Sequence, residues 1–81
     1  MDFLNNLSVS IFPNPANDVI TIRSDYSGSV EIFNAIGKRE LITTLNDYQQ
    51  SINISNLKAG MYLLKMTSGS GQILISKFIK N

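Results

Sequence analysis

The sequence predicts an all-β domain, a seven-stranded antiparallel β-sandwich, on three observations. Apolar and polar residues alternate with period two over short segments, which is typical of strands with one buried face. Turn-forming residues interrupt this alternation at spacings of about ten residues, as they do in sandwiches. The eleven isoleucines favour pleated sheets over helices, because branched side chains lose rotamer freedom in a helix.

Each expected strand is bounded by a turn signal. Pro13-Asn14-Pro15 ends the first strand, because proline cannot donate to a strand ladder and Asn favours turns. Asn34-Ala35-Ile36-Gly37 follows the third strand, with Gly37 expected at positive φ, although the start of this segment also fits a helical turn. The expected strands cover residues 7–12, 18–23, 29–34, 38–45, 50–54, 61–67 and 72–80.

The composition excludes most catalytic functions. The 81 residues include no His and no Cys, which removes the commonest general base, the thiol nucleophile and the most frequent metal ligands. The six carboxylates are scattered, so no acid–base pair is indicated. The net charge of +1 indicates no nucleic-acid partner, and no apolar run approaches the ~18 residues of a membrane span. We therefore expect no enzyme activity, no cofactor and no metal.

The chain is expected to form one domain. Residues 7–81 carry the alternating pattern, and their number fits a single small core. Residues 1–6 precede the pattern and lack the basic start and apolar run of a signal peptide, so they are interpreted as a linker or an expression remnant.

One spacing predicts a structural hydrogen bond. Leu57, Gly60 and Tyr62 resemble a tyrosine corner, in which a tyrosine near the start of a strand donates its hydroxyl to the backbone upstream. A buried phenol needs such a partner, so a structural role for Tyr62 is favoured over a functional one.

Four segments of the sequence form an ordered set of motifs. They are Ile11-Phe12-Pro13-Asn14-Pro15-Ala16, Val30-Glu31-Ile32-Phe33-Asn34-Ala35-Ile36-Gly37-Lys38, Leu57-Lys58-Ala59-Gly60-Met61-Tyr62-Leu63-Leu64 and Lys77-Phe78-Ile79-Lys80. In this order they resemble the C-terminal sorting domain of type IX secretion system cargo proteins, also called the Por secretion system type A sorting domain, and the last segment resembles the family's Lys-x-hydrophobic-Lys ending. Phe12 stands where the family more often has Tyr, and Arg39-Glu40 follows Lys38 where an apolar residue is more usual.

The resemblance implies an immunoglobulin-like sandwich that serves as a secretion signal. Such a domain follows its cargo in the chain and directs it from the periplasm to the outer-membrane surface or the medium. The implied partners are the type IX translocon and a sortase-like outer-membrane protease, which removes the domain. The chemistry then belongs to the protease, and this chain is its substrate, with cleavage in or upstream of residues 1–6.

An edge strand presents unpaired backbone groups to a partner, and the final strand is a candidate for such a contact. We expect the translocon to read it through Phe78 and Ile79 as apolar anchors, between Lys77 and Lys80. The alternative is that Ile79 packs inside and Phe78 covers the sheet. The full set of candidate recognition residues is Pro13, Asn14, Pro15, Gly37, Lys38, Lys77, Phe78, Ile79 and Lys80. For Pro13, Asn14 and Pro15 a rigid turn is the competing interpretation.

Two other interpretations stay open. An accessory spacer or carbohydrate-binding module of a surface enzyme also fits a small sandwich, and Tyr26, Phe33 and Tyr48 are its candidate sugar-stacking aromatics, although they are dispersed in the sequence. Pairing of two copies through a sheet edge, giving a dimer, is the second.

Overall fold

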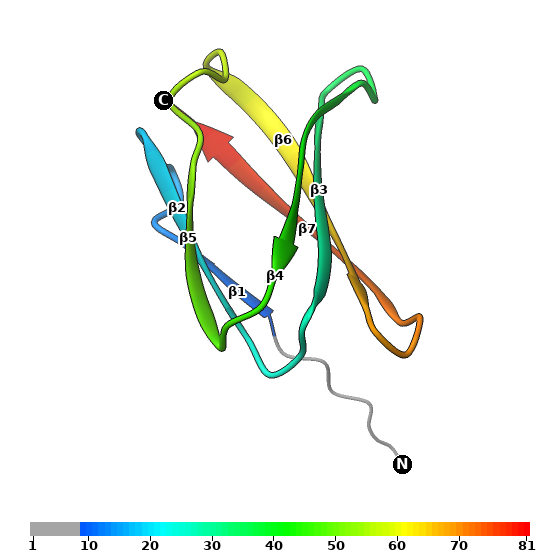
Figure 1. Ribbon diagram of the computed structural model, residues 1–81. Helices are drawn as coiled ribbons and strands as arrows, with labels where there is room; N and C mark the ends of the chain where they lie inside the picture. Colours follow the sequence, from blue (N-terminus) through cyan, green and yellow to red (C-terminus); the bar gives the residue numbers. More distant parts are fainter. Residues whose placement is uncertain (1–8) are drawn as a thin grey trace.

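The chain folds into two antiparallel sheets packed face to face (Figure 1). A computed structural model describes residues 9–81, so the expected residues 7 and 8 of the first strand and the segment 1–6 lie outside the described part. All seven expected strands are present, with ends within two residues of those predicted. They are β1 (Val9–Phe12), β2 (Val19–Ser24), β3 (Gly28–Asn34), β4 (Arg39–Leu45), β5 (Gln49–Asn53), β6 (Gly60–Ser68) and β7 (Ile73–Lys80).

The sheets differ in size. The smaller has the order β1-β2-β5 and the larger the order β4-β3-β6-β7, with every neighbouring pair antiparallel. Residues 9–81 form no helix, so this part of the chain holds no helical membrane span. The fold class predicted from the alternation is therefore confirmed.

The alternating strand directions sort the connections into two groups. The loops 13–18, 35–38 and 54–59 lie at one end of the sandwich, where β7 also finishes (Figure 1). We call this the motif end. The turns 25–27, 46–48 and 69–72 lie at the other end, where the chain enters β1, and we call this the opposite end.

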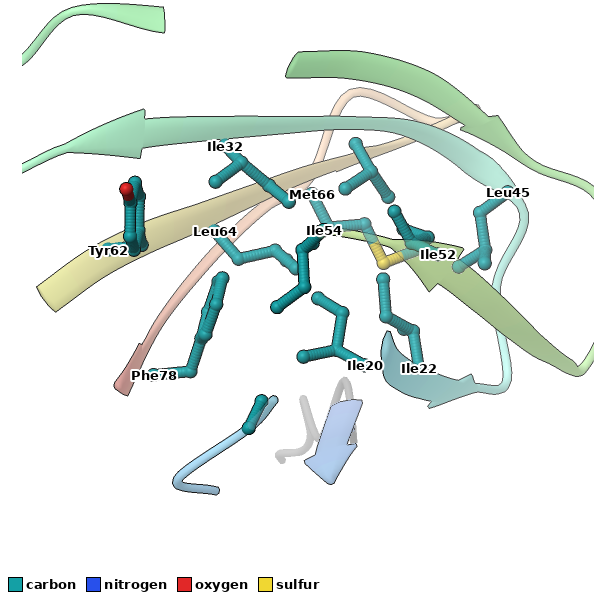
Figure 2. Packing of buried hydrophobic residues seen from close by; sticks show 12 residues of the cluster. Ile20, Ile22, Ile32, Leu45, Ile52, Ile54, Tyr62, Leu64, Met66 and Phe78 are labelled. Carbon is teal, nitrogen blue, oxygen red and sulfur yellow. The ribbon is translucent and has the colours of Figure 1, made fainter. Parts of the chain in front are cut away.

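The core is the space between the sheets, filled by alternate side chains of each strand (Figure 2). Val30 and Ile32 of β3 are fully buried, as the period-two pattern predicts, while Glu31 between them faces outward. Near the motif end, Tyr62 stacks on Phe78 with 5.6 Å between ring centroids. The buried cluster comprises Ala16, Ile20, Ile22, Val30, Ile32, Leu45, Ile52, Ile54, Tyr62, Leu64, Met66 and Phe78.

Gly28 allows two strands of the larger sheet to approach closely at the opposite end. A Cβ atom placed there would collide with the backbone carbonyl of Thr67 on β6. Only glycine avoids that collision, so the start of β3 requires this residue.

Candidate functional site

The first and last motif segments are joined by hydrogen bonds at the motif end. The Asn14 Oδ1 atom accepts from the backbone N–H of Ile79 at 2.9 Å, and the Ala16 N–H donates to the Ile79 carbonyl at 2.8 Å. The Asn81 N–H in turn donates to the Ala16 carbonyl at 2.8 Å, and its side-chain amide donates to Asn17 Oδ1 at 3.2 Å. The loop therefore pairs with the end of β7 much as a short strand would.

This pairing gives the Pro13-Asn14-Pro15 segment a role beyond reversing the chain. The Asn14 side chain supplies an acceptor for the Ile79 N–H where a neighbouring strand would supply a backbone carbonyl. Both X-Pro bonds of the segment are cis. Because Asn14 and Ile79 are 65 positions apart, no local sequence signal announces their contact.

The second motif contributes a tight turn between β3 and β4. Asn34 Oδ1 accepts from the N–H groups of Ile36 at 3.1 Å and Lys38 at 2.9 Å, and the Gly37 N–H donates to the Asn34 carbonyl at 3.0 Å. Gly37 has φ +88°, so its predicted positive φ is confirmed, and residues 35–38 form a short turn between β3 and β4 and no helix. Ile36 at the tip is 88% exposed.

The third motif forms the expected tyrosine corner. The Tyr62 hydroxyl donates to the Lys58 carbonyl at 2.6 Å, which is the upstream bond predicted from the spacing. Leu57 is half-buried against the core, and its N–H donates to the Ile54 carbonyl at 3.0 Å. These contacts support a structural role for Tyr62.

The second and third motifs border a shared cleft of about 400 Å³. The turn 34–36 and Glu40 form one wall, and residues 56–62 form the other. Among residues 9–81 no three His, Cys, Asp or Glu side chains gather, so neither this cleft nor its surroundings offer a cluster of metal ligands.

The last motif is positioned differently from the expectation. Phe78 is fully buried against Tyr62, whereas Ile79 is 42% exposed on the outer face. The alternative in which Ile79 packs inside and Phe78 covers the sheet is therefore wrong. Phe78 is also inaccessible as a partner's anchor in the folded domain. The period-two alternation predicts that the Phe78 and Ile79 side chains face opposite sides of the sheet. Stacking on Tyr62 of β6 places Phe78 on the inner side.

The two lysines of the last motif also differ from one another. Lys77 is exposed, whereas Lys80 is only 8% exposed and its Nζ donates to the Asn81 carbonyl at 3.3 Å. Lys80 shares the inward-facing side of β7 with Phe78, because the two are two positions apart. Lys77 and Ile79 are thus the accessible pair.

The candidate sugar-stacking aromatics do not form one strip. Tyr26 and Tyr48 are brought together at the opposite end, where they line a hollow of about 230 Å³ with Asp25 and Asp47. Phe33 is half-buried in the larger sheet. The three are dispersed in sequence, but two of them meet in space because they occupy successive turns at one end.

The geometry defines a class of protein: a small immunoglobulin-like sandwich whose four motif segments converge at one end. The family model for the secretion system C-terminal sorting domain matches residues 10–81, and the chain belongs to that family. It is accordingly a non-catalytic sorting domain.

Two curated relatives are larger proteins. The ulvan lyase NLR42 of Nonlabens ulvanivorans is 32% identical over 77 residues, which are 91% of this chain and 14% of that protein. The beta-agarase D of Zobellia galactanivorans is 33% identical over 72 residues, 88% of this chain and again 14% of the relative. The chain thus spans about one seventh of the length of these relatives.

Solved structures support the fold. A DUF3244 family protein from Bacteroides vulgatus, with an immunoglobulin-like β-sandwich, is similar with a TM-score of 0.74 at 20% identity, covering 90% of this chain and 84% of that one. CopC from Methylosinus trichosporium is similar with a TM-score of 0.52 at 13% identity, covering 90% and 91%. At these identities the likeness concerns the fold alone.

Proposed function

We propose that this domain directs a cargo protein, attached ahead of it in the chain, through the type IX secretion system to the cell surface. The observation that carries the proposal is the convergence of the four motif segments at the motif end. The chain enters the domain at the opposite end (Figure 1). A cargo attached there leaves the motif end open to the secretion machinery.

The contact with the translocon involves the accessible part of the candidate residues. Lys38, Lys77 and Ile79 are exposed, as are Pro13 and Pro15. In this proposal they form the contact surface. Asn14 and Gly37 shape it through their backbone geometry and hydrogen bonds, while Phe78 and Lys80 support it from the inner side of β7.

The proposal includes the later steps of export. The cargo folds in the periplasm, crosses the outer membrane and is then released from the domain by a sortase-like protease that cuts in or upstream of residues 1–6. The similarity to parts of an ulvan lyase and a beta-agarase supports an exported enzyme as the cargo. The activity in those names belongs to those proteins, and here it concerns only the attached cargo.

A reporter fusion tests the sorting role. A signal peptide and a fluorescent protein are placed ahead of the 81-residue chain and expressed in a type IX-competent host and in a strain without the translocon. We expect surface or secreted reporter in the first strain and periplasmic reporter in the second. Equal distribution in both strains would contradict the proposal.

One observation favours a second candidate function, a carbohydrate-binding accessory module. Tyr26 and Tyr48 line one hollow together with Asp25 and Asp47, and aromatic faces beside carboxylates suit a sugar ring. Titration of the domain with algal oligosaccharides, followed by tyrosine fluorescence, tests it. A response that Tyr48→Ser abolishes supports this function, and a flat titration excludes it for the sugars used.

A further inference from the structure

Among residues 9–81, the outer edge of β7 carries backbone hydrogen bonds at only one end. The backbone N–H and C=O of Ile79 both point away from β6, because they bond to Asn14 and Ala16 of the first loop. In an antiparallel pair, residues alternate between those bonded across the pair and those whose backbone groups point outward. Ile79 belongs to the outward kind.

The same alternation leaves three more residues of β7 with outward backbone groups. The register between β6 and β7 is continuous from Ile73 to Lys80, so Ile73, Ile75 and Lys77 are of the same kind as Ile79. Within residues 9–81 no recorded backbone bond covers these three. We call Ile73, Ile75 and Lys77 the open edge.

The side chains of the open edge also face solvent. Ile73 is 54% and Ile75 65% exposed on the outer face of the larger sheet, and Lys77 beside them is exposed. Long, apolar edge strands pair readily with other chains, so proteins normally block them with charges, bulges or covering segments. Here the covering segment at Ile79 and the single charge of Lys77 protect one end of the strand, and neither covers Ile73 or Ile75.

The other edges of the two sheets are less suited to pairing. The described part of β1 has four residues, and β5 exposes the polar side chains of Gln49, Ser51 and Asn53. On β4, the Gln50 side-chain amide donates to the Thr44 carbonyl at 2.8 Å and so occupies part of that edge. The open edge of β7 is therefore the best-prepared site for an added strand in the described part of the chain.

We propose that the open edge is a strand-addition site for an extended segment of the export machinery. This inference rests on the proposed function and names the mode of contact. The incoming strand bonds to the backbone of the open edge, places apolar side chains opposite Ile73 and Ile75, and places a carboxylate opposite Lys77.

Charge favours this occupant over a second copy of the domain. The ion pair recorded within residues 9–81 joins Glu31 to Arg39 at 3.1 Å and does not include Lys77. In a two-fold pairing centred on Ile75, each Lys77 lies opposite the other copy's Ile73, so neither lysine gains a carboxylate. A strand with an acidic residue opposite Lys77 pairs with its ammonium group and also bonds to the backbone groups of the open edge.

A proline substitution at the open edge tests the inference. Ile75→Pro removes an outward N–H and leaves the bonds to β6 intact, because proline is tolerated on an edge strand whose N–H faces solvent. Ser51→Pro is the matched control. Ser51 lies on the β5 edge. The Ser24 N–H donates to the Tyr48 carbonyl and the Ile54 N–H donates to the Asp18 carbonyl, so even-numbered residues of β5 bond to β2. By alternation the N–H of Ser51 points away from β2, toward the open side.

The readout is the surface fraction of the reporter fused to the whole 81-residue chain. We expect Ile75→Pro to lower it by about tenfold and Ser51→Pro to leave it within about twofold of the wild type, both variants being folded by circular dichroism. Equal export of the two folded variants would overturn the inference. If the unmodified fusion is not exported, the proposed function fails first, and the inference falls with it.

A charge substitution keeps the test decisive if a proline variant does not fold. Lys77→Glu places a like charge against the expected carboxylate and should lower the surface fraction about tenfold. Arg23→Glu makes the same change of net charge at an exposed residue of β2, away from the motif end, and should have little effect. Equal export of these two variants would contradict the charge assignment.

A dimer of the purified domain, dissociated by Ile75→Pro in analytical ultracentrifugation, would identify a second copy as the occupant and overturn the proposal.

Discussion

The two ends of the sandwich are held in different ways. At the opposite end most turn bonds join partners close in sequence, such as the Ser24 hydroxyl with the backbone of Tyr26 and the Gly71 N–H with the Ser68 carbonyl. One longer-range bond, from the Gly69 N–H to the Ser27 carbonyl at 3.2 Å, links two turns there. At the motif end, Asn14 reaches Ile79 across 65 positions. Four hydrogen bonds join the loop 13–18 to Ile79 and Asn81, which is more than chain reversal requires, so this contact joins the two segments for a reason beyond turning the chain.

Phe78→Ala should have the largest effect, because it removes the ring that supports the motif end from inside. The substitution leaves a cavity beside Tyr62 and should cost about 3–5 kcal/mol of the free energy of unfolding. Urea denaturation of the purified domain measures it. Ile79→Ala on the exposed side of the same strand is the control and should cost below about 1 kcal/mol. Equal losses would contradict the assignment of faces.

Much of this architecture could be predicted from the sequence, because strands and turns are local. The period-two alternation located all seven strands, and Gly37 and Tyr62 were predicted correctly from turn and corner spacing. The burial of Phe78 could not be predicted, because the alternation assigns residues to the two sides of the strand and does not say which side faces the core. The contact between Asn14 and Ile79 was equally inaccessible, because it exists only once both sheets are assembled.

Tyr62→Phe should have an intermediate effect. It keeps the stacked ring and removes the 2.6 Å hydrogen bond to the Lys58 carbonyl, which should cost about 1–1.5 kcal/mol. Thermal unfolding should show a lower midpoint with the same cooperativity. An unchanged midpoint would mean that the corner does not stabilise the loop 54–59.

Asn14→Ala should have the smallest effect on stability, and it tests most directly whether the two ends differ in function. It removes the acceptor of the Ile79 N–H and should cost about 1 kcal/mol, with faster hydrogen exchange at that amide. Ser24→Ala removes the bonds to Tyr26 at the opposite end at similar cost. We expect only Asn14→Ala to reduce export of a fused reporter. Equal export by the two variants would remove the functional distinction between the ends.

The central claim is that the motif end carries the sorting signal. The most direct measurement compares the surface fraction of the reporter for two double variants of exposed residues, Lys38→Glu with Ile79→Asn at the motif end and Asp47→Asn with Tyr48→Ser at the opposite end. The account predicts that the surface fraction of the reporter falls about tenfold for the motif-end variant and equals that of the wild type for the opposite-end variant. Loss confined to the opposite-end variant, with both domains folded, would contradict it.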